Sequence, residues 1–168
     1  AEALGDTSAE YYTAMSLSLG YDNFEGGVDY LNTAIEQNPN YATAHHRLAI
    51  QYQFRGKKGD LEKASEIIDQ AISLDPNSAI IQQCAGAIYR SSKDYKTALK
   101  IYKKLKEDHP DFKKENILLT MSQLYSYLMD WEKCGELVSY FEDKKIESLP
   151  DHAANFSVYY ALTNQKSK

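Results

Sequence analysis

The chain has 168 residues, of which 43% are hydrophobic, and it carries a formal net charge of -5. This length can bury a continuous core without disulfides or a metal, so we expect one domain spanning residues 1–168. No apolar run approaches the roughly 18 to 20 residues of a membrane-spanning helix, and no signal peptide is visible, so we expect a cytoplasmic location or the soluble face of a larger complex.

Charge is unevenly distributed along the chain. Residues 1–46 contain seven acidic residues and no lysine or arginine, whereas residues 93–114 contain eight lysines. Lys96, Lys100 and Lys103 recur at a spacing that aligns them on one face of a helix. A solvated outer helix face explains this stripe, and charge-driven self-association is the alternative.

Two landmarks repeat along the chain, which indicates internal repeats. The four prolines occur at intervals of about 34 to 40 residues, at Pro39, Pro76, Pro110 and Pro150. A second landmark pairs an Asn or Asp with a small residue four positions later, and the copies are Asn23 with Gly27, Asp60 with Ala64, Asp94 with Ala98 and Asp130 with Cys134. The two landmarks advance together, so each interval is predicted to be one structural unit.

Each unit is predicted to contain two helices. In residues 78–91 and 95–108 apolar residues recur at three- and four-residue spacing, which is typical of amphipathic helices. The Asn or Asp of each second landmark is predicted to be the N-cap of the second helix. Because proline restricts the residue before it to extended geometry, the second helices are expected to end near Asn38, Asp75 and His109.

The small residue of each unit is predicted to lie where its two helices cross. Glycine inside a helix costs about 1 kcal/mol relative to alanine, so Gly27 needs a compensating reason. Close packing of the two helix backbones within one unit would supply it.

These features resemble the tetratricopeptide repeat, in which a 34-residue unit carries small, aromatic and proline residues at fixed steps. The third unit matches best, and its matching residues are Ala85, Gly86, Tyr89, Ala98, Tyr102 and Pro110. The resemblance implies an all-α, right-handed α-solenoid of about four helix-turn-helix repeats, at about 8–40, 41–77, 78–111 and 112–143. A C-terminal capping helix is expected at about residues 151–164.

No catalytic or metal-binding constellation stands out in the sequence. His45 and His46 are adjacent, so they diverge on a helix, and no third ligand lies at helical spacing from them. Cys84 and Cys134 form no closely spaced pair, which fits a reducing compartment. We therefore expect no enzyme activity, no cofactor and no metal, and the negative net charge disfavours nucleic-acid binding.

The resemblance implies that the first helices of the repeats line a concave groove that binds a peptide or helix of a partner protein. Family steps carried over to this sequence give a groove of Tyr12, Ser16, His46, Arg47, Ile50, Phe54, Gln83, Ala87, Arg90 and Gln123. Arg47, Phe54 and Tyr12 are the expected hot spots, because arginine can bind a carboxylate through two hydrogen bonds and aromatic rings bury a large area.

A protein-binding scaffold or adaptor is therefore the leading functional prediction. A chaperone for an exported client and a structural subunit of a larger assembly are the alternatives. One subgroup of the family binds the acidic C-terminus of chaperones through groove lysines, arginines and asparagines. This sequence departs from that subgroup, because Tyr12, Ser16, Arg47, Ile80 and Cys84 occupy the corresponding positions.

Overall fold

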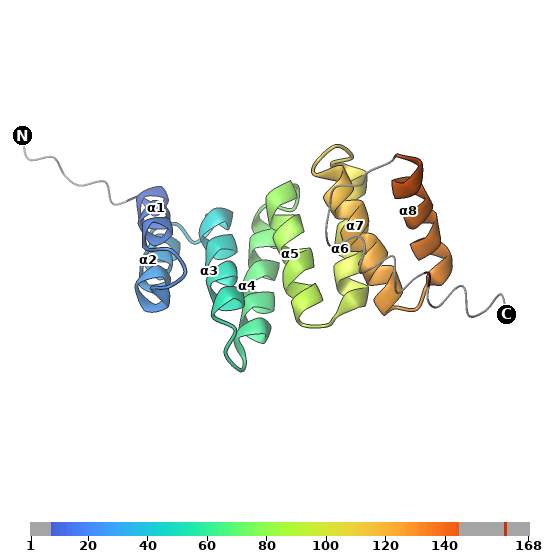
Figure 1. The fold of residues 1–168 in the computed structure, drawn as a ribbon. Coiled ribbons are helices and arrows are strands. Elements are labelled where there is room, and N and C mark those ends of the chain that lie inside the picture. Colours follow the sequence, from blue (N-terminus) through green and yellow to red (C-terminus); the bar gives the residue numbers. More distant parts are fainter. Residues whose placement is uncertain (1–7, 145–159, 161–168) are drawn as a thin grey trace, which may run out of the picture. The chain divides into compact units, whose positions relative to one another are not determined.

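The computed structural model describes residues 8–144 and Tyr160, and in this part of the chain all regular secondary structure is helical (Figure 1). The helices are α1 (Ala9–Leu19), α2 (Phe24–Gln37), α3 (Ala42–Arg55), α4 (Asp60–Leu74), α5 (Ala79–Ser91), α6 (Tyr95–Asp108), α7 (Lys114–Tyr127) and α8 (Trp131–Asp143). The all-α fold class with four helix-turn-helix repeats is confirmed.

The predicted capping helix at about 151–164 lies outside the described residues, with the exception of Tyr160. That residue is helical, and its hydroxyl donates a hydrogen bond to the carboxylate of Glu142 at the end of α8. None of the helices described is long and apolar enough to cross a lipid bilayer.

The chain divides into two compact units, with the boundary between Lys93 and Asp94. The first unit contains α1 to α5, and the second contains α6 to α8. The boundary falls inside the predicted third repeat, 78–111, between its two helices. The division into two units does not test the predicted single domain or the predicted repeat boundaries, which stay predictions.

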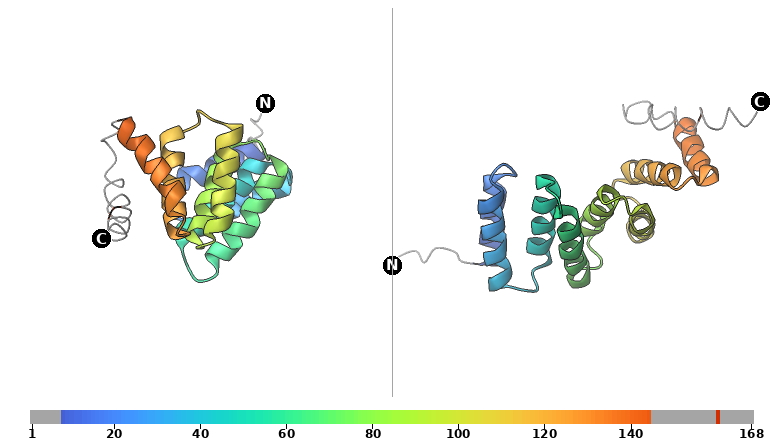
Figure 2. Two further views of the ribbon diagram at one scale, coloured as in Figure 1. Left: turned by 90° about the vertical axis from the view of Figure 1, so that its right-hand side faces the viewer. Right: turned by 90° about the horizontal axis from the view of Figure 1, so that it is seen from below.

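Each unit is built by packing helices that are neighbours in sequence (Figures 1 and 2). In the first unit α1 to α5 pack in chain order, and α3 also contacts both α1 and α5. The first helices of successive pairs therefore lie next to one another and form one layer. In the second unit α6 packs on α7, and α7 packs on α8.

The cores of the units consist of aliphatic and aromatic side chains at helical spacing. Leu31, Ile68 and Ile88 have no exposed surface in the first unit, and Leu105 and Leu124 have none in the second. Burying such a side chain contributes about 1.5 to 3 kcal/mol, so these residues fix which face of each helix points inward.

Three of the four predicted N-caps are confirmed. The side chains of Asn23, Asp94 and Asp130 each accept a hydrogen bond from the amide three residues later, at 3.1, 3.1 and 3.3 Å. These bonds satisfy backbone donors that have no partner inside a helix. For Asp94 they lower the pKa of the carboxyl below its ordinary value, chiefly through Thr97.

The prediction that Asp60 is an N-cap is wrong. Gly59 caps α4 instead, with a φ of 88° that favours glycine, and Asp60 is the first residue of the helix. The longer turn before α4 makes this possible, because the Asp60 carboxylate accepts a hydrogen bond from the amide of Lys57 at 2.8 Å.

The predicted ends of the second helices are confirmed. Asn38, Asp75 and His109 are the C-caps of α2, α4 and α6, and a proline follows each of them directly. The proline cannot donate a backbone hydrogen bond and restricts the residue before it, so the helix stops there.

The small residues are buried, but the predicted reason is wrong for Gly27. Ala64 and Ala98 have no exposed surface. A Cβ added to Gly27 would lie 2.8 Å from Nε2 of Gln51, which is on α3 and thus belongs to the next helix pair. Glycine at this step therefore lets α2 approach α3 rather than its own partner α1.

Candidate functional site

The layer formed by α1, α3 and α5 carries nine of the ten residues predicted to line the groove. Only Gln123 lies elsewhere, on α7 in the second unit. The exposure of the side chains in this layer decides which of them can contact a partner.

Three predicted groove residues are buried. Ser16, His46 and Ile50 expose 1%, 4% and 8% of their surface. The hydroxyl of Ser16 donates a hydrogen bond of 2.7 Å to the carbonyl oxygen of Thr13 on its own helix. These three residues pack inside the helix layer. Only the more exposed residues of the layer can contact a partner.

His46 joins α3 to α5. Its Nε2 lies 3.0 Å from the sulfur of Cys84, and both residues were predicted at groove steps. Burial, with a smaller contribution from Arg47, lowers the pKa of His46 from 6.5 to about 4. The imidazole is therefore neutral at physiological pH and adds no positive charge to this face.

The most exposed aromatic residue of this face is Phe54. It exposes 63% of its surface and stacks on Tyr21, with 4.1 Å between ring centroids and 15° between ring planes. Tyr21 lies in the turn after α1 and is itself 44% exposed. The pair, called here the aromatic platform, presents a flat apolar surface at the ends of two neighbouring helices.

Tyr21 is not among the residues predicted from the sequence, because the family steps stop at the end of the first helix. The available signal was its position one repeat length before Phe54, just after a helix predicted to lie beside that of Phe54. The ring of Tyr12, an expected hot spot, packs against the ring of Tyr30 on α2, with 6.3 Å between the ring centroids.

The turn that follows the aromatic platform is held by Arg55. Its guanidinium binds the Asp60 carboxylate through two hydrogen bonds of 2.8 and 2.5 Å, and its Cζ lies 3.8 Å from the centroid of the Phe24 ring. Hydrogen bonding from Arg55 lowers the pKa of Asp60 to about 2, and the Lys57 amide adds to this effect. These contacts tie α2, α3 and α4 together and fix the backbone next to Phe54.

Two arginines add positive charge to the face. Arg47 on α3 and Arg90 on α5 are both half-buried. The Nε of Arg47 is buried and has no hydrogen-bond partner among the described residues. In the same part of the chain no group of three or more His, Cys, Asp and Glu side chains is placed to hold a metal ion.

The repeated helix pair matches a known family of repeats. Three tetratricopeptide repeat family models match this sequence, at residues 30–64, 53–78 and 85–111. Residues 30–78 and 85–111 of the chain carry tetratricopeptide repeats. These repeats account for the paired helices in the matched segments and for the prolines that follow α2, α4 and α6.

One curated relative also contains a matching segment. Anaphase-promoting complex subunit 3 of Schizosaccharomyces pombe is 26% identical to this chain over 117 residues, which is 67% of the chain. The match spans only 17% of the length of that relative.

Solved structures share the tetratricopeptide fold at low sequence identity. A tetratricopeptide repeat protein from Parabacteroides merdae has a TM-score of 0.78 and 14% identity, over 94% of this chain and 60% of that one. PilF of Pseudomonas aeruginosa has a TM-score of 0.76 and 18% identity, over 94% of this chain and 69% of that one. The first tetratricopeptide domain of Spaghetti (RPAP3), bound to the HSP90 peptide SRMEEVD, has a TM-score of 0.65 and 15% identity. This match covers 74% of this chain and 96% of that one.

Proposed function

We propose that this chain is a non-enzymatic scaffold that binds a short segment of a partner protein on the face formed by α1, α3 and α5. Tetratricopeptide repeat proteins generally mediate protein–protein interactions. The aromatic platform of Tyr21 and Phe54 is the observation that carries the proposal for this chain, because the two stacked rings expose 44% and 63% of their surface side by side.

The partner segment is proposed to combine an apolar side chain with a carboxylate. The apolar side chain would cover Phe54, and burying aromatic surface of this kind is a frequent source of binding energy. The carboxylate would bind Arg47 or Arg90, whose planar guanidinium groups suit two parallel hydrogen bonds. Ser16, His46 and Ile50 would support this face without touching the segment.

A peptide like the HSP90 peptide SRMEEVD bound by the Spaghetti domain is not the partner we propose. Tyr12 and Ser16 stand where a lysine and an asparagine are expected in that subgroup, and Ser16 is buried. A role as a subunit of a larger assembly remains the second candidate, since the curated relative is named as a complex subunit. Both candidates are compatible with a cytoplasmic protein, in which Cys84 and Cys134 form no disulfide with each other.

The test begins with affinity purification of partners and then measures binding of peptides that tile the partner sequence. Phe54→Ala is expected to weaken the best peptide at least about tenfold, which is the scale of a binding hot spot. Tyr127→Ala is the matched control, because Tyr127 is 57% exposed, stacks on another ring, that of Tyr95, and belongs to the second unit rather than to the α1, α3 and α5 layer. Unchanged affinity in both Phe54→Ala and Arg47→Ala would contradict the proposed face.

A further inference from the structure

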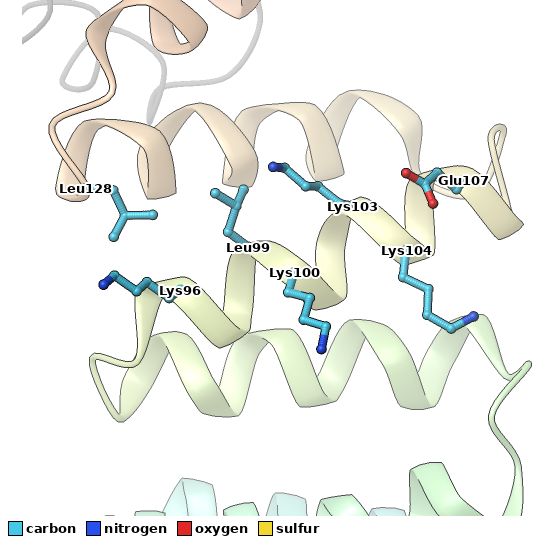
Figure 3. A pocket seen from close by; sticks show the side chains of 7 residues that line it. All are labelled: Lys96, Leu99, Lys100, Lys103, Lys104, Glu107 and Leu128. Atoms are coloured by element: carbon cyan, nitrogen blue, oxygen red, sulfur yellow. The ribbon is translucent and has the colours of Figure 1, made fainter.

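Helix α6 carries a hollow lined mainly by lysine side chains. Its volume is about 470 Å³, and four of its seven lining residues are lysines (Figure 3). The lining residues are Lys96, Leu99, Lys100, Lys103, Lys104, Glu107 and Leu128. All of them belong to the second unit, and this set is called here the lysine hollow.

Part of this positive charge is offset within the described part of the chain, because Glu107 adds one carboxylate to the lining and Lys96 interacts electrostatically with the Asp94 carboxylate. Lys104 forms an ion pair with Asp108 on its own helix. Lys103 lies 5.6 Å from the ring centroid of Tyr125. No ion pair joins Lys96, Lys100 or Lys103 to a carboxylate among the described residues, so the hollow favours an anionic occupant.

The floor of the lysine hollow is apolar. Leu99 exposes only 8% of its surface, and Leu128 is half-buried. The residues on either side of Leu128, Tyr127 and Met129, expose 57% and 74%. A good occupant would therefore combine carboxylates with apolar side chains, rather than carry charge alone.

The acidic part of the chain itself offers a surface of that composition. Glu25, Asp29 and Glu36 are exposed on α2 at a spacing that places them on one face of the helix. Asp29 also lines a hollow of about 500 Å³ together with Tyr12, Leu19 and Tyr30. No lysine or arginine occurs in residues 1–46. Arg55 of α3 approaches Glu25 at 3.9 Å, but the Glu25 side chain is 83% exposed, so this pair offsets little of the charge.

We propose that the lysine hollow on α6 of one copy docks the acidic α2 surface of a second copy. The two surfaces differ, so the contact is head-to-tail and leaves one free surface of each kind on a pair of molecules. Such contacts extend into chains or close into rings. Opposite charges steer the encounter, while the leucines and tyrosines supply apolar contact.

Exposed charges make this contact salt-sensitive. The screening length is about 10 Å at 0.1 M salt and about 3 Å at 1 M, so lysine and carboxylate groups across the contact lose most of their attraction at high salt. Self-association is therefore expected at low ionic strength and micromolar to millimolar chain concentration, and dissociation is expected as salt is raised.

The experiment measures the mass of the full chain by sedimentation velocity, at salt concentrations of about 50 and 500 mM. Lys96→Glu with Lys100→Glu is one variant, and Asp29→Lys with Glu36→Lys is the complementary one. Each is expected to weaken self-association at least about tenfold, and an equimolar mixture of the two is expected to restore it. Circular dichroism of each variant checks that the helices are retained.

A matched control separates a specific contact from general repulsion. Lys58→Glu with Lys144→Glu changes the net charge as much as the lysine variant does, and both residues are exposed and lie outside the hollow. This control is expected to associate like the wild type. A wild-type chain that stays monomeric at low salt overturns the proposal, and so does an equal loss in the control or a mixture that fails to associate. An acidic segment of another protein would then be the better occupant for the hollow.

Discussion

The Nε2 atom of His46 lies 3.0 Å from the sulfur of Cys84, which connects α3 to α5 inside the first unit. His46 exposes only 4% of its surface. An imidazole this deep is costly to protonate, and its pKa is lowered to about 4, chiefly by burial and secondarily by Arg47.

Stability of the chain is expected to fall as the pH drops from about 6.5 towards 4. In that range His46 is protonated in the unfolded chain but stays neutral in the folded chain, so acid favours unfolding. Below about pH 4 the imidazole is protonated in both states, and this contribution to stability stops changing. Its full size is about 3 kcal/mol for a change of this extent. Urea titrations at pH 7 and 4.5 should show a smaller loss for His46→Gln than for the wild type.

The Cys84→Ala variant is the control for that prediction. Because burial rather than the thiol is the main cause of the lowered pKa, this variant should keep the pH dependence of the wild type. Equal pH dependence in wild type and His46→Gln would show that the imidazole titrates normally in the folded chain.

Features set by local chemistry could be predicted from the sequence. The ends of α2, α4 and α6 follow from proline, which acts on the residue before it whatever the tertiary packing is. The N-caps at Asn23, Asp94 and Asp130 follow from a side chain that reaches a backbone amide three residues away. The three- and four-residue spacing of apolar residues then predicts two helices in each repeat.

Features that depend on a second helix could not be read from spacing alone. Asp60 has the cap residue type, but a longer turn allows Arg55 and the Lys57 amide to bind its carboxylate. Ser16 and His46 occupy groove steps, yet the closeness of the α1, α3 and α5 layer buries them. Whether a polar residue at a groove step is exposed depends on the side chains of the neighbouring helices, which vary between repeats.

Gly27 and Gln51 are expected to be energetically coupled. Alanine in place of a helical glycine gains about 1 kcal/mol, but the added Cβ would lie 2.8 Å from Nε2 of Gln51, whose side chain is 4% exposed. Gly27→Ala should therefore be neutral or destabilising in the wild type. In a Gln51→Ala background the same change should stabilise by about 1 kcal/mol.

Chemical denaturation of the four members of this double-mutant cycle measures the coupling. Ser65→Ala on α4 would serve as a comparison background, because Ser65 is not among the nearest neighbours of a Cβ added to Gly27 and its hydroxyl bonds within its own helix. An effect of Gly27→Ala that is the same in the wild type and in Gln51→Ala would mean that the Gln51 side chain moves aside at no cost.

The Arg55–Asp60 pair is expected to stabilise the first unit across most of the pH range. Asp60→Asn should lower the melting temperature at pH 7, because it removes the charged acceptor of the Arg55 hydrogen bonds. Residue 60 is only 3% exposed, so water cannot replace the weakened bonds. The pKa of Asp60 is lowered from 3.8 to about 2, so its contribution is present above about 3.8 and is lost as pH falls through about 2. The difference between wild type and Asp60→Asn should shrink over that interval.

Glu25→Gln is the comparison for the pair. Glu25 also approaches Arg55, at 3.9 Å, but its side chain is 83% exposed, so the ion pair should contribute little. A melting temperature lowered equally by Glu25→Gln and Asp60→Asn would show that long-range charge, rather than the paired hydrogen bonds, stabilises this turn.

Met129 is expected to be replaceable by glycine with a gain in stability. It follows the C-cap of α7 with a φ of 59°, and the amide of Asp130 bonds back to the carbonyl of Tyr125 at 2.9 Å, which is the helix ending that glycine favours. The left-handed conformation costs a residue with a Cβ about 1 to 2 kcal/mol, and the side chain is 74% exposed, so little packing is lost. Met129→Gly should therefore raise the free energy of unfolding by about 1 kcal/mol in urea titrations, after the entropy cost of glycine is included.

Met129→Ala is the control for this prediction. It keeps the same backbone cost and should change the free energy of unfolding little. If both variants lose stability equally, the methionine side chain contributes contacts that outweigh its backbone conformation.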